Sequence, residues 1–260
     1  MKRLFLSAIM PSLNEERNIL SAINNTLAAL DHFDIDGEII VINDGSTDGT
    51  EDLVNEVVRK HTRVKIIRHD VTQGIGASFW DGVDHAIGDI VVMIPGDDEN
   101  DPMEIFRYTP LLQHVDIVVP FIFNREVRSL FRNALSFVYR FIINTTFFVN
   151  FNYTNGTVLY RKSILKELEY RSKSFFFQTD ILVRTVKKGY LFAEVPYRLD
   201  MRKDGISKAV SFPSLLKVMR GYLRLARDYY GKKNINTDLP EDSVTSVRYN
   251  KRTGSAQDYD

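Results

Sequence analysis

Short apolar runs alternate with stretches of helical spacing along residues 4–120, and this alternation limits the possible folds more than any other feature of the chain. Runs such as Leu4–Met10, Glu38–Ile42 and Asp89–Ile94 have the length and composition of buried strands. Between the runs, apolar residues recur every three or four positions, as they do in Glu16–Leu30. Because such alternation is typical of right-handed βαβ units, we expect an α/β fold with a Rossmann-like, mainly parallel sheet flanked by helices.

The rhythm changes after residue 121. Phe131–Phe151 is strongly apolar, but Arg132 and Arg140 interrupt it, which favours an amphipathic helix over a membrane-spanning one. Ser211–Tyr230 also has the spacing of an amphipathic helix. We expect one domain over residues 1–230, divided near residue 121. Residues 231–260 form a polar tail that we expect to be flexible or to pack as a late arm.

Composition excludes several kinds of protein. Lysine plus arginine and aspartate plus glutamate both number 34, so no net positive field attracts nucleic acid. The chain has no cysteine, which excludes disulfides, thiolate zinc sites, iron–sulfur clusters and a cysteine nucleophile. The apolar run near the N-terminus is followed at once by acidic residues, so we expect a buried strand there and no signal peptide. The histidines lack ligand spacing and are predicted to be structural or surface residues: His32, His61, His69, His85 and His114.

Polar segments follow four of the predicted strands, at residues 11–16, 43–50, 69–76 and 95–102. Each of them alone would suit an ordinary turn. Ligands of open parallel sheets, however, bind at the carboxyl ends of the strands, where these segments would together form one cleft. Thr47 is a candidate N-cap for the helix after the second strand, and Asp101 with Pro102 is a candidate N-cap for a later helix.

The segment at residues 97–101 is the most acidic part of this cleft. Asp97 and Glu99 lie two residues apart, so on an extended backbone their side chains share one face. Carboxylate oxygens are ligands that suit Mg²⁺ or Mn²⁺, although a solvated acidic loop is the alternative. Gly74 and Gly76 precede a predicted helix and would let its backbone approach phosphates, which is a weak signal by itself.

In this order the segments resemble those of family 2 glycosyltransferases, which have the GT-A fold. The matching motifs are Pro11-x-x-Asn14-Glu15-Glu16, Asn43-Asp44-Gly45-Ser46-Thr47-Asp48, Gly74-x-Gly76-Ala77 and Gly88-Asp89. Arg202-x-x-Gly205-x-Ser207-Lys208 is similar to a segment of the polyprenyl-phosphate (dolichol-phosphate-type) sugar transferases within that family. The resemblance covers about residues 4–210.

The resemblance implies an inverting transfer of a sugar from a UDP- or GDP-linked donor to a polyprenyl phosphate or a glycan hydroxyl. It assigns residues 1–121 to nucleotide binding and residues 122–230 to the acceptor. It implies Mg²⁺ or Mn²⁺ on Asp97 and Glu99, a general base at Asp180, phosphate contacts from Arg202, and acceptor contacts from Arg128 and Arg132. The implied donor-binding residues are Pro11, Ser12, Glu15, Asp44, Gln73, Gly74, Gly76, Asp97 and Lys208. Such a protein is expected in the cytoplasm, with peripheral contact with the inner face of the membrane left open.

Some positions depart from the family pattern. Pro95 replaces the first aspartate of the D-x-D metal motif, so either Asp97 and Glu99 suffice, or Asp98 contributes, or the dependence on metal is weak. Asn152-Tyr153-Thr154-Asn155-Gly156 replaces the Asp-Pro-Thr-Ser-Gly-like run of the lipid-phosphate subgroup. A non-catalytic nucleotide-sugar-binding or scaffold protein on the same fold is therefore the main alternative. A nucleotidyltransferase is disfavoured, because no glycine-rich loop with a basic residue follows the first strand.

Overall fold

The computed structural model describes residues 4–124, 129–198, 212–231, 239–241 and 243–254. Its centre is a seven-stranded sheet of order β3-β2-β1-β4-β6-β5-β7. The strands are β1 (Leu6–Ser12), β2 (Gly37–Asn43), β3 (Val64–Arg68), β4 (Ile90–Met93), β5 (Ile117–Ile122), β6 (Leu159–Arg161) and β7 (Phe192–Tyr197). Among these strands only β6 runs antiparallel to its neighbours, which confirms the expected mainly parallel sheet.

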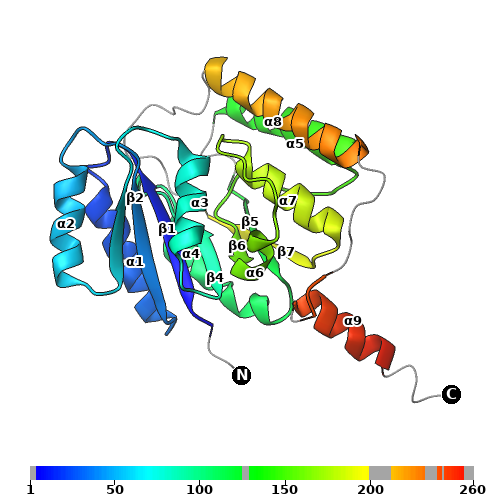
Figure 1. Cartoon of the computed structure of the whole chain (residues 1–260), viewed down its shortest axis with the longest axis horizontal. Coiled ribbons are helices and arrows are strands. Elements are labelled where there is room, and N and C mark those ends of the chain that lie inside the picture. Colours follow the sequence, from blue (N-terminus) through cyan, green and yellow to red (C-terminus); the bar gives the residue numbers. More distant parts are fainter. Residues whose placement is uncertain (1–3, 125–128, 199–211, 232–238, 242, 255–260) are drawn as a thin grey trace.

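Helices cover both faces of the sheet (Figure 1). The first face packs against α1 (Ile19–His32), α2 (Thr50–Lys60), α4 (Pro102–Phe106) and the short 3-10 helix η1 (Thr109–Gln113). The second face packs against α3 (Ile75–His85), α6 (Lys162–Lys166) and α7 (Phe177–Lys188). Strand β1 supplies both cores, because its side chains alternate: Ala8 and Met10 join the first cluster, and Ile9 joins the second.

The predicted helix ends are partly correct. Asp101 caps α4 as expected, since its carboxylate accepts a hydrogen bond from the backbone nitrogen of Met103. Gly189 ends α7 with a φ of 107°, a left-handed conformation that suits glycine. The prediction for Thr47 is wrong, because α2 begins at Thr50. The carboxylate of Asp48, and not the hydroxyl of Thr47, accepts the backbone N–H of Thr50 at 3.1 Å.

Two long helices, α5 (Leu130–Phe147) and α8 (Phe212–Gly231), pack outside α7 (Figure 1). They contact each other directly, since the Tyr222 hydroxyl lies 2.9 Å from the Thr146 hydroxyl. Gly221 lets α8 approach closely, because a Cβ at that position would lie 2.7 Å from the ring of Phe176. Within the described ranges, no helix combines the length and apolar character that crossing a membrane requires.

The tail contains a helix that the sequence analysis missed, α9 (Val244–Gly254). Its N-terminus is held by Asp116, a fully buried residue directly before β5. The Asp116 carboxylate accepts hydrogen bonds from the backbone nitrogens of Val244 and Thr245, at 3.0 and 3.1 Å. Part of the tail therefore packs on the domain as an arm, which was one of the two expectations.

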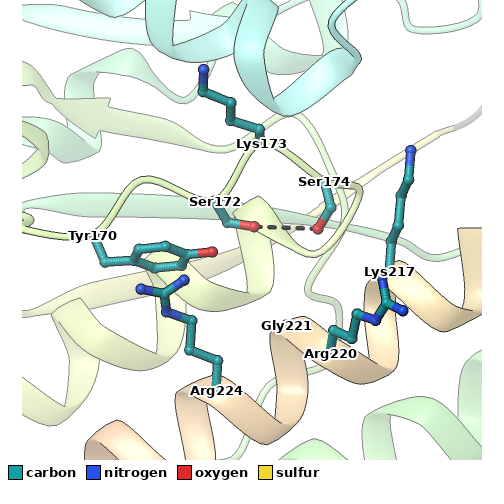
Figure 2. Close-up of a pocket in the computed structure, with 8 residues that line it drawn as sticks. All are labelled: Tyr170, Ser172, Lys173, Ser174, Lys217, Arg220, Gly221 and Arg224. Atoms are coloured by element: carbon teal, nitrogen blue, oxygen red, sulfur yellow. Dashed lines mark hydrogen bonds between the residues drawn. The ribbon is translucent and has the colours of Figure 1, made fainter.

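Helix α8 and the loop before α7 line an open pocket of about 270 Å³ (Figure 2). Residues of the loop line one side of the pocket, and residues of α8 line the other. The lining residues are Tyr170, Ser172, Lys173, Ser174, Lys217, Arg220, Gly221 and Arg224.

Candidate functional site

The loops that follow β1 and β2 are hydrogen-bonded to each other. Asn14 has a left-handed φ of 57°, and its side-chain oxygen accepts a hydrogen bond from the Thr47 backbone nitrogen at 2.8 Å. In return, the Asn14 backbone nitrogen donates to the Ser46 hydroxyl at 3.0 Å. The Glu15 backbone nitrogen donates to the Thr50 hydroxyl at 2.8 Å. The motif that begins at Pro11 and the motif that contains Asp44 therefore form one connected edge.

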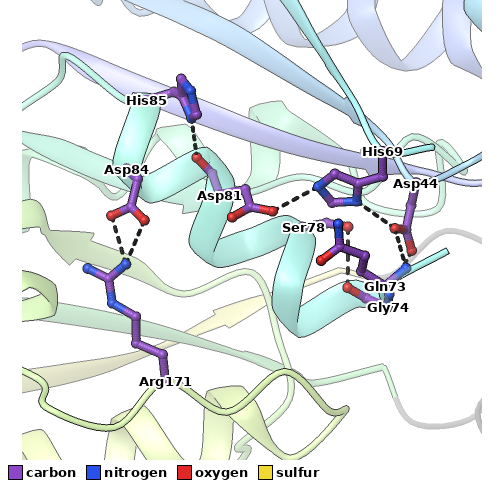
Figure 3. A network of polar contacts seen from close by, with 9 residues as sticks. All are labelled: Asp44, His69, Gln73, Gly74, Ser78, Asp81, Asp84, His85 and Arg171. Carbon is purple, nitrogen blue, oxygen red and sulfur yellow. Dashed lines mark hydrogen bonds and ion pairs between the residues drawn. The ribbon is translucent and has the colours of Figure 1, made fainter. Parts of the chain in front are cut away.

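Asp44 is the centre of a buried polar network (Figure 3). Its side chain is almost completely buried, and it accepts hydrogen bonds from the backbone nitrogens of Gln73 and Gly74, both at 2.8 Å. The ring of His69 lies on the other side, with Nδ1 2.7 Å from the Asp44 carboxylate and Nε2 2.8 Å from that of Asp81. Three of the predicted donor-binding residues, Asp44, Gln73 and Gly74, are thus in direct contact.

His69 and Asp81 are site residues that the sequence analysis missed. The sequence predicts a structural or surface role for His69, because no second histidine stands at ligand spacing. Its position was the available signal, since His69 directly follows β3 at the same sheet edge as Asp44. Asp81 lies on α3 and gave no signal of its own.

The glycines at the N-terminus of α3, the N-cap Gly74 and Gly76 in the first turn, have a packing role. Gly74 has a φ of 99°, which glycine adopts without strain. A Cβ on Gly76 would lie 2.6 Å from the backbone of Lys173, so the loop before α7 can rest here only because residue 76 is glycine. The Gly74 nitrogen is already bonded to Asp44. The predicted contact of these glycines with donor phosphates remains a prediction.

The acidic loop after β4 lies against the end of β1. The Gly96 nitrogen donates to the Pro11 carbonyl at 3.0 Å, and a Cβ on Gly96 would lie 2.4 Å from the Ser12 hydroxyl. This close approach places Asp97 beside the β1 end. The Asp97 carboxylate also accepts a hydrogen bond from the Glu99 backbone nitrogen at 3.2 Å.

The other carboxylates of this loop have structural partners. Asp98 adopts a φ of 56° and accepts hydrogen bonds from Ser21 and Asn25 of α1, at 2.6 and 2.9 Å. Asp101 caps α4. Of the possibilities left open by Pro95, these contacts disfavour Asp98 as a ligand; a metal held by Asp97 and Glu99, and a weak dependence on metal, both stay open.

In the part of the chain that the structure describes, no three histidine or acidic side chains gather into a closed metal site. Mg²⁺ in substrate sites is commonly held by only one or two carboxylates, with substrate phosphates and water as the other ligands. The pair Asp97 and Glu99 fits a donor set of that kind.

Asp180 lies in a different environment, in the first turn of α7. Its side chain is 1% exposed, and its Oδ2 lies 3.0 Å from Nε of Arg184. Arg184 also pairs with Asp228 of α8 at 2.8 Å. Burial raises the pKa of Asp180 despite the neighbouring Arg184. The second oxygen, Oδ1, has no hydrogen-bond partner among the described residues. Asp180 therefore belongs to an ion-pair network between α7 and α8.

Most of the residues predicted to contact the acceptor or the donor phosphates lie outside the part of the chain that the structure describes. Arg132 is exposed in the first turn of α5, where its backbone nitrogen donates to the capping Ser129 hydroxyl. Arg128, Arg202 and Lys208 lie outside the described residues. Their roles, like those of all the site residues, remain predictions.

Comparison with known proteins identifies the family. The model of the family described as glycosyl transferase family 2 matches residues 7–169. The chain is 27% identical over 209 residues to dodecaprenyl-phosphate galacturonate synthase of Rhizobium johnstonii, covering 78% of this chain and 61% of that protein. It is also 27% identical over 207 residues to undecaprenyl-phosphate 4-deoxy-4-formamido-L-arabinose transferase of Edwardsiella ictaluri, with coverages of 78% and 62%. The chain thus spans about three-fifths of the length of these curated relatives.

Solved structures agree on the fold. Glucosyl-3-phosphoglycerate synthase of Mycobacterium tuberculosis, in complex with Mn²⁺, UDP and phosphoglyceric acid, superposes with a TM-score of 0.66 at 20% identity, covering 86% of this chain and 78% of that one. The same enzyme in complex with Mg²⁺ and UDP gives 0.65 at 19% identity, with coverages of 86% and 79%. These similarities confirm the predicted GT-A fold.

Proposed function

Because the chain belongs to glycosyl transferase family 2, we propose that it is an inverting glycosyltransferase that uses a UDP- or GDP-linked sugar. The observation that carries the proposal is the assembly at one sheet edge of the Asp44 network and the loop that bears Asp97. The similar enzyme of M. tuberculosis was crystallised with UDP-glucose and Mn²⁺, which supports a donor of this class.

Asp44 is suited to hold the nucleoside. A carboxylate has about four acceptor positions, and the donors described here, His69 and the nitrogens of Gln73 and Gly74, use three of them. The remaining position would accept an N–H of the base. Because the other three bonds fix the carboxylate, it would bind the base without having to be reoriented. Pro11, Ser12 and Glu15 at the neighbouring β1 end would complete the nucleoside site.

Asp97 and Glu99 would hold the divalent cation, Mg²⁺ or Mn²⁺. That ion would supply positive charge to the diphosphate leaving group when it is bound. Arg202 and Lys208 would add further positive charge at the same phosphates. The loop that carries Asp97 rests on Ser12 through Gly96, so the metal ligands would keep a fixed position relative to the nucleoside site.

For the acceptor we favour a polyprenyl phosphate over a glycan hydroxyl. A hydroxyl acceptor needs a base within hydrogen-bond reach, whereas a phosphate is already anionic and needs positioning. Asp180 is the predicted base, but it is buried in an ion pair with Arg184. The names of the curated relatives, which specify dodecaprenyl and undecaprenyl phosphate, support the same choice. Arg128 and Arg132 would position the acceptor phosphate.

Peripheral contact with a membrane fits a lipid acceptor. Large apolar side chains are exposed on α5, including Phe131 at 72% and Phe141 at 61%, and on α8, including Leu223 at 58%. Apolar side chains gathered on exposed helices commonly mark a binding surface. We propose that α5 and α8 contact the inner face of the cytoplasmic membrane, where a lipid-linked acceptor would be found.

A transfer assay tests the proposal. The purified protein is incubated with Mn²⁺ and radiolabelled UDP- or GDP-sugars, and with vesicles that do or do not contain undecaprenyl phosphate. We expect a labelled lipid with one donor class, and no product from the Asp97→Ala variant. Asp180→Asn should stay within about tenfold of the wild type with a phosphate acceptor, whereas loss of a general base costs about 10²–10⁴-fold.

The second candidate function is a non-catalytic nucleotide-sugar-binding protein, which Pro95 favours. Nucleotide binding by the folded protein without hydrolysis or transfer to either acceptor class would support that candidate. It would contradict the proposed enzyme.

A further inference from the structure

The pocket between α8 and the loop before α7 is lined by cations. Lys217, Arg220 and Arg224 come from α8, and Lys173 comes from the loop, with its ammonium group directed away from α8 (Figure 2). The lining contains no acidic residue. Within the described ranges, none of these four side chains forms an ion pair with a carboxylate. A cluster of cations around a pocket of about 270 Å³ is repulsive unless an anion or solvent compensates it.

The loop side of the pocket is rigidly attached to α3. The indole nitrogen of Trp80 donates to the Ser172 carbonyl at 3.2 Å. Arg171 pairs with Asp84 at 2.7 Å and stacks on the Trp80 ring at 4.8 Å. The backbone of Lys173 rests on Gly76. These contacts fix the loop, so the position of the pocket wall does not depend on a ligand.

The helix side is fixed as well. The guanidinium of Arg224 lies 3.8 Å from the centre of the Tyr170 ring, which holds it at the pocket wall. The nearby carboxylates of Asp180 and Asp228 are both paired with Arg184. Arg184 pairs with both acids, and Arg224 also interacts electrostatically with Asp180, so Lys217 and Arg220 are the α8 cations whose charges are available to a ligand.

The pocket also offers neutral hydrogen-bonding groups. The hydroxyls of Ser172 and Ser174 lie 3.2 Å apart (Figure 2). Hydroxyls combined with arginine and lysine are a donor set that suits phosphate oxygens, because charge-assisted hydrogen bonds to phosphate are short and strong. An apolar ligand would gain little from such a lining.

We propose that this pocket is a binding site for the phosphate group of a ligand other than the donor nucleotide. The loop that forms one wall of the site rests on Gly76 and Trp80 of α3, and Asp81 of the same helix contacts His69 of the Asp44 network. The phosphate belongs either to a lipid headgroup or to a free phosphate. Both sources offer the same oxygens to Lys217 and Arg220.

Two binding measurements test the site and separate the sources. The first is calorimetric titration of the whole chain with inorganic phosphate. The second is cosedimentation with phosphatidylcholine vesicles that do or do not contain phosphatidic acid. Arg220→Gln and Lys217→Gln each remove one lining cation. Arg227→Gln is the matched control, because it removes the same charge from α8 at an exposed side chain outside the pocket.

We expect Arg220→Gln and Lys217→Gln each to weaken binding about tenfold, the usual effect of losing a hydrogen bond to a charged group, and Arg227→Gln to leave it unchanged. An effect on phosphate titration identifies a free-phosphate site, and an effect confined to phosphatidic acid vesicles identifies a headgroup site. The proposal is overturned if the three variants behave alike with both probes, or if the folded wild type binds neither probe.

Binding of UDP and GDP with Mn²⁺ is measured on the same samples. Unchanged nucleotide binding in Arg220→Gln, together with weaker phosphate binding, would show that the pocket is separate from the donor site. If the wild type bound neither UDP nor GDP, the proposed function would be refuted. The phosphate-binding measurements would still test the pocket.

Discussion

Replacing His69 with leucine tests whether the Asp44 network is built to hold a buried carboxylate. His69 is 6% exposed and Asp44 is 4% exposed, so water cannot freely replace a lost contact. The imidazole contacts Asp44 at 2.7 Å and Asp81 at 2.8 Å. Leucine fills a similar space without providing either contact. Asp44 would then keep only the backbone donors of Gln73 and Gly74.

The expected cost follows from these contacts. A hydrogen bond to a buried charged group contributes about 1.5–3 kcal/mol, and Asp81 is exposed enough for water to compensate its share. For a domain near this size, 1 kcal/mol corresponds to about 2–4 °C in the melting temperature, so we expect a decrease of roughly 3–12 °C. Nucleotide affinity should also fall, because Asp44 would be less firmly oriented.

Thermal unfolding followed by circular dichroism measures the first effect, and calorimetric titration with the preferred nucleoside diphosphate measures the second. His85→Leu is the control, since His85 is exposed on the same helix as Asp81 and its ring forms a hydrogen bond with the Asp81 carbonyl at 2.8 Å. If His69→Leu melts within about 1 °C of the wild type and binds nucleotide equally well, then His69 does not support Asp44 and the reasoning is refuted.

Two further predictions concern other parts of the sheet. Gly96→Ala should destabilise the protein by about 1–3 kcal/mol and weaken metal-dependent nucleotide binding, because the new Cβ would meet the Ser12 hydroxyl at 2.4 Å. Gly231→Ala, which meets nothing within 4 Å, is the control in chemical unfolding and titration. Burial would raise the pKa of Glu38, but hydrogen bonds from the Ile87 nitrogen, Lys65 and Ser7 lower it below 4.5 overall. Glu38 therefore stabilises the fold above pH 4.5 and loses this effect as the pH falls through its folded pKa. In the Glu38→Gln variant, the free energy of unfolding should decrease less as the pH falls through this range.

The local periodicity of the chain was sufficient to predict most of the sheet. Strands β1–β5 are short apolar runs, so the local pattern predicts them even where the pairing is distant in sequence, as between β1 and β4 or between β5 and β7. The antiparallel strand β6 pairs with β4 and β5 across an intervening α5, and no local signal specifies its direction. Helix α9 was missed because it is mostly polar and its N-terminus is bound by Asp116, which is 128 residues away from Val244.

In the candidate site, too, features specified by local sequence were predicted, and features that depend on distant contacts were not. Asp44 and Asp97 were found because their sequence motifs are local and specific. The role of His69 was missed because it depends on Asp44 and Asp81, which meet it only through the pairing of β2 and β3 and the placement of α3. The packing role of Gly76 was missed because it depends on a close approach to the backbone of Lys173, which comes from the other half of the chain. Such contacts between distant segments cannot be deduced from residue spacing.

The central claim is that the edge formed by Asp44 and Asp97 binds a nucleoside diphosphate with a divalent cation. Calorimetric titration of the whole chain with UDP and with GDP, each with and without Mn²⁺, tests it most directly. We predict saturable binding of one of the two nucleotides that requires Mn²⁺ and that Asp97→Ala removes without unfolding the protein. Failure of the folded wild type to bind either nucleotide, or equal binding by Asp97→Ala, would contradict the claim.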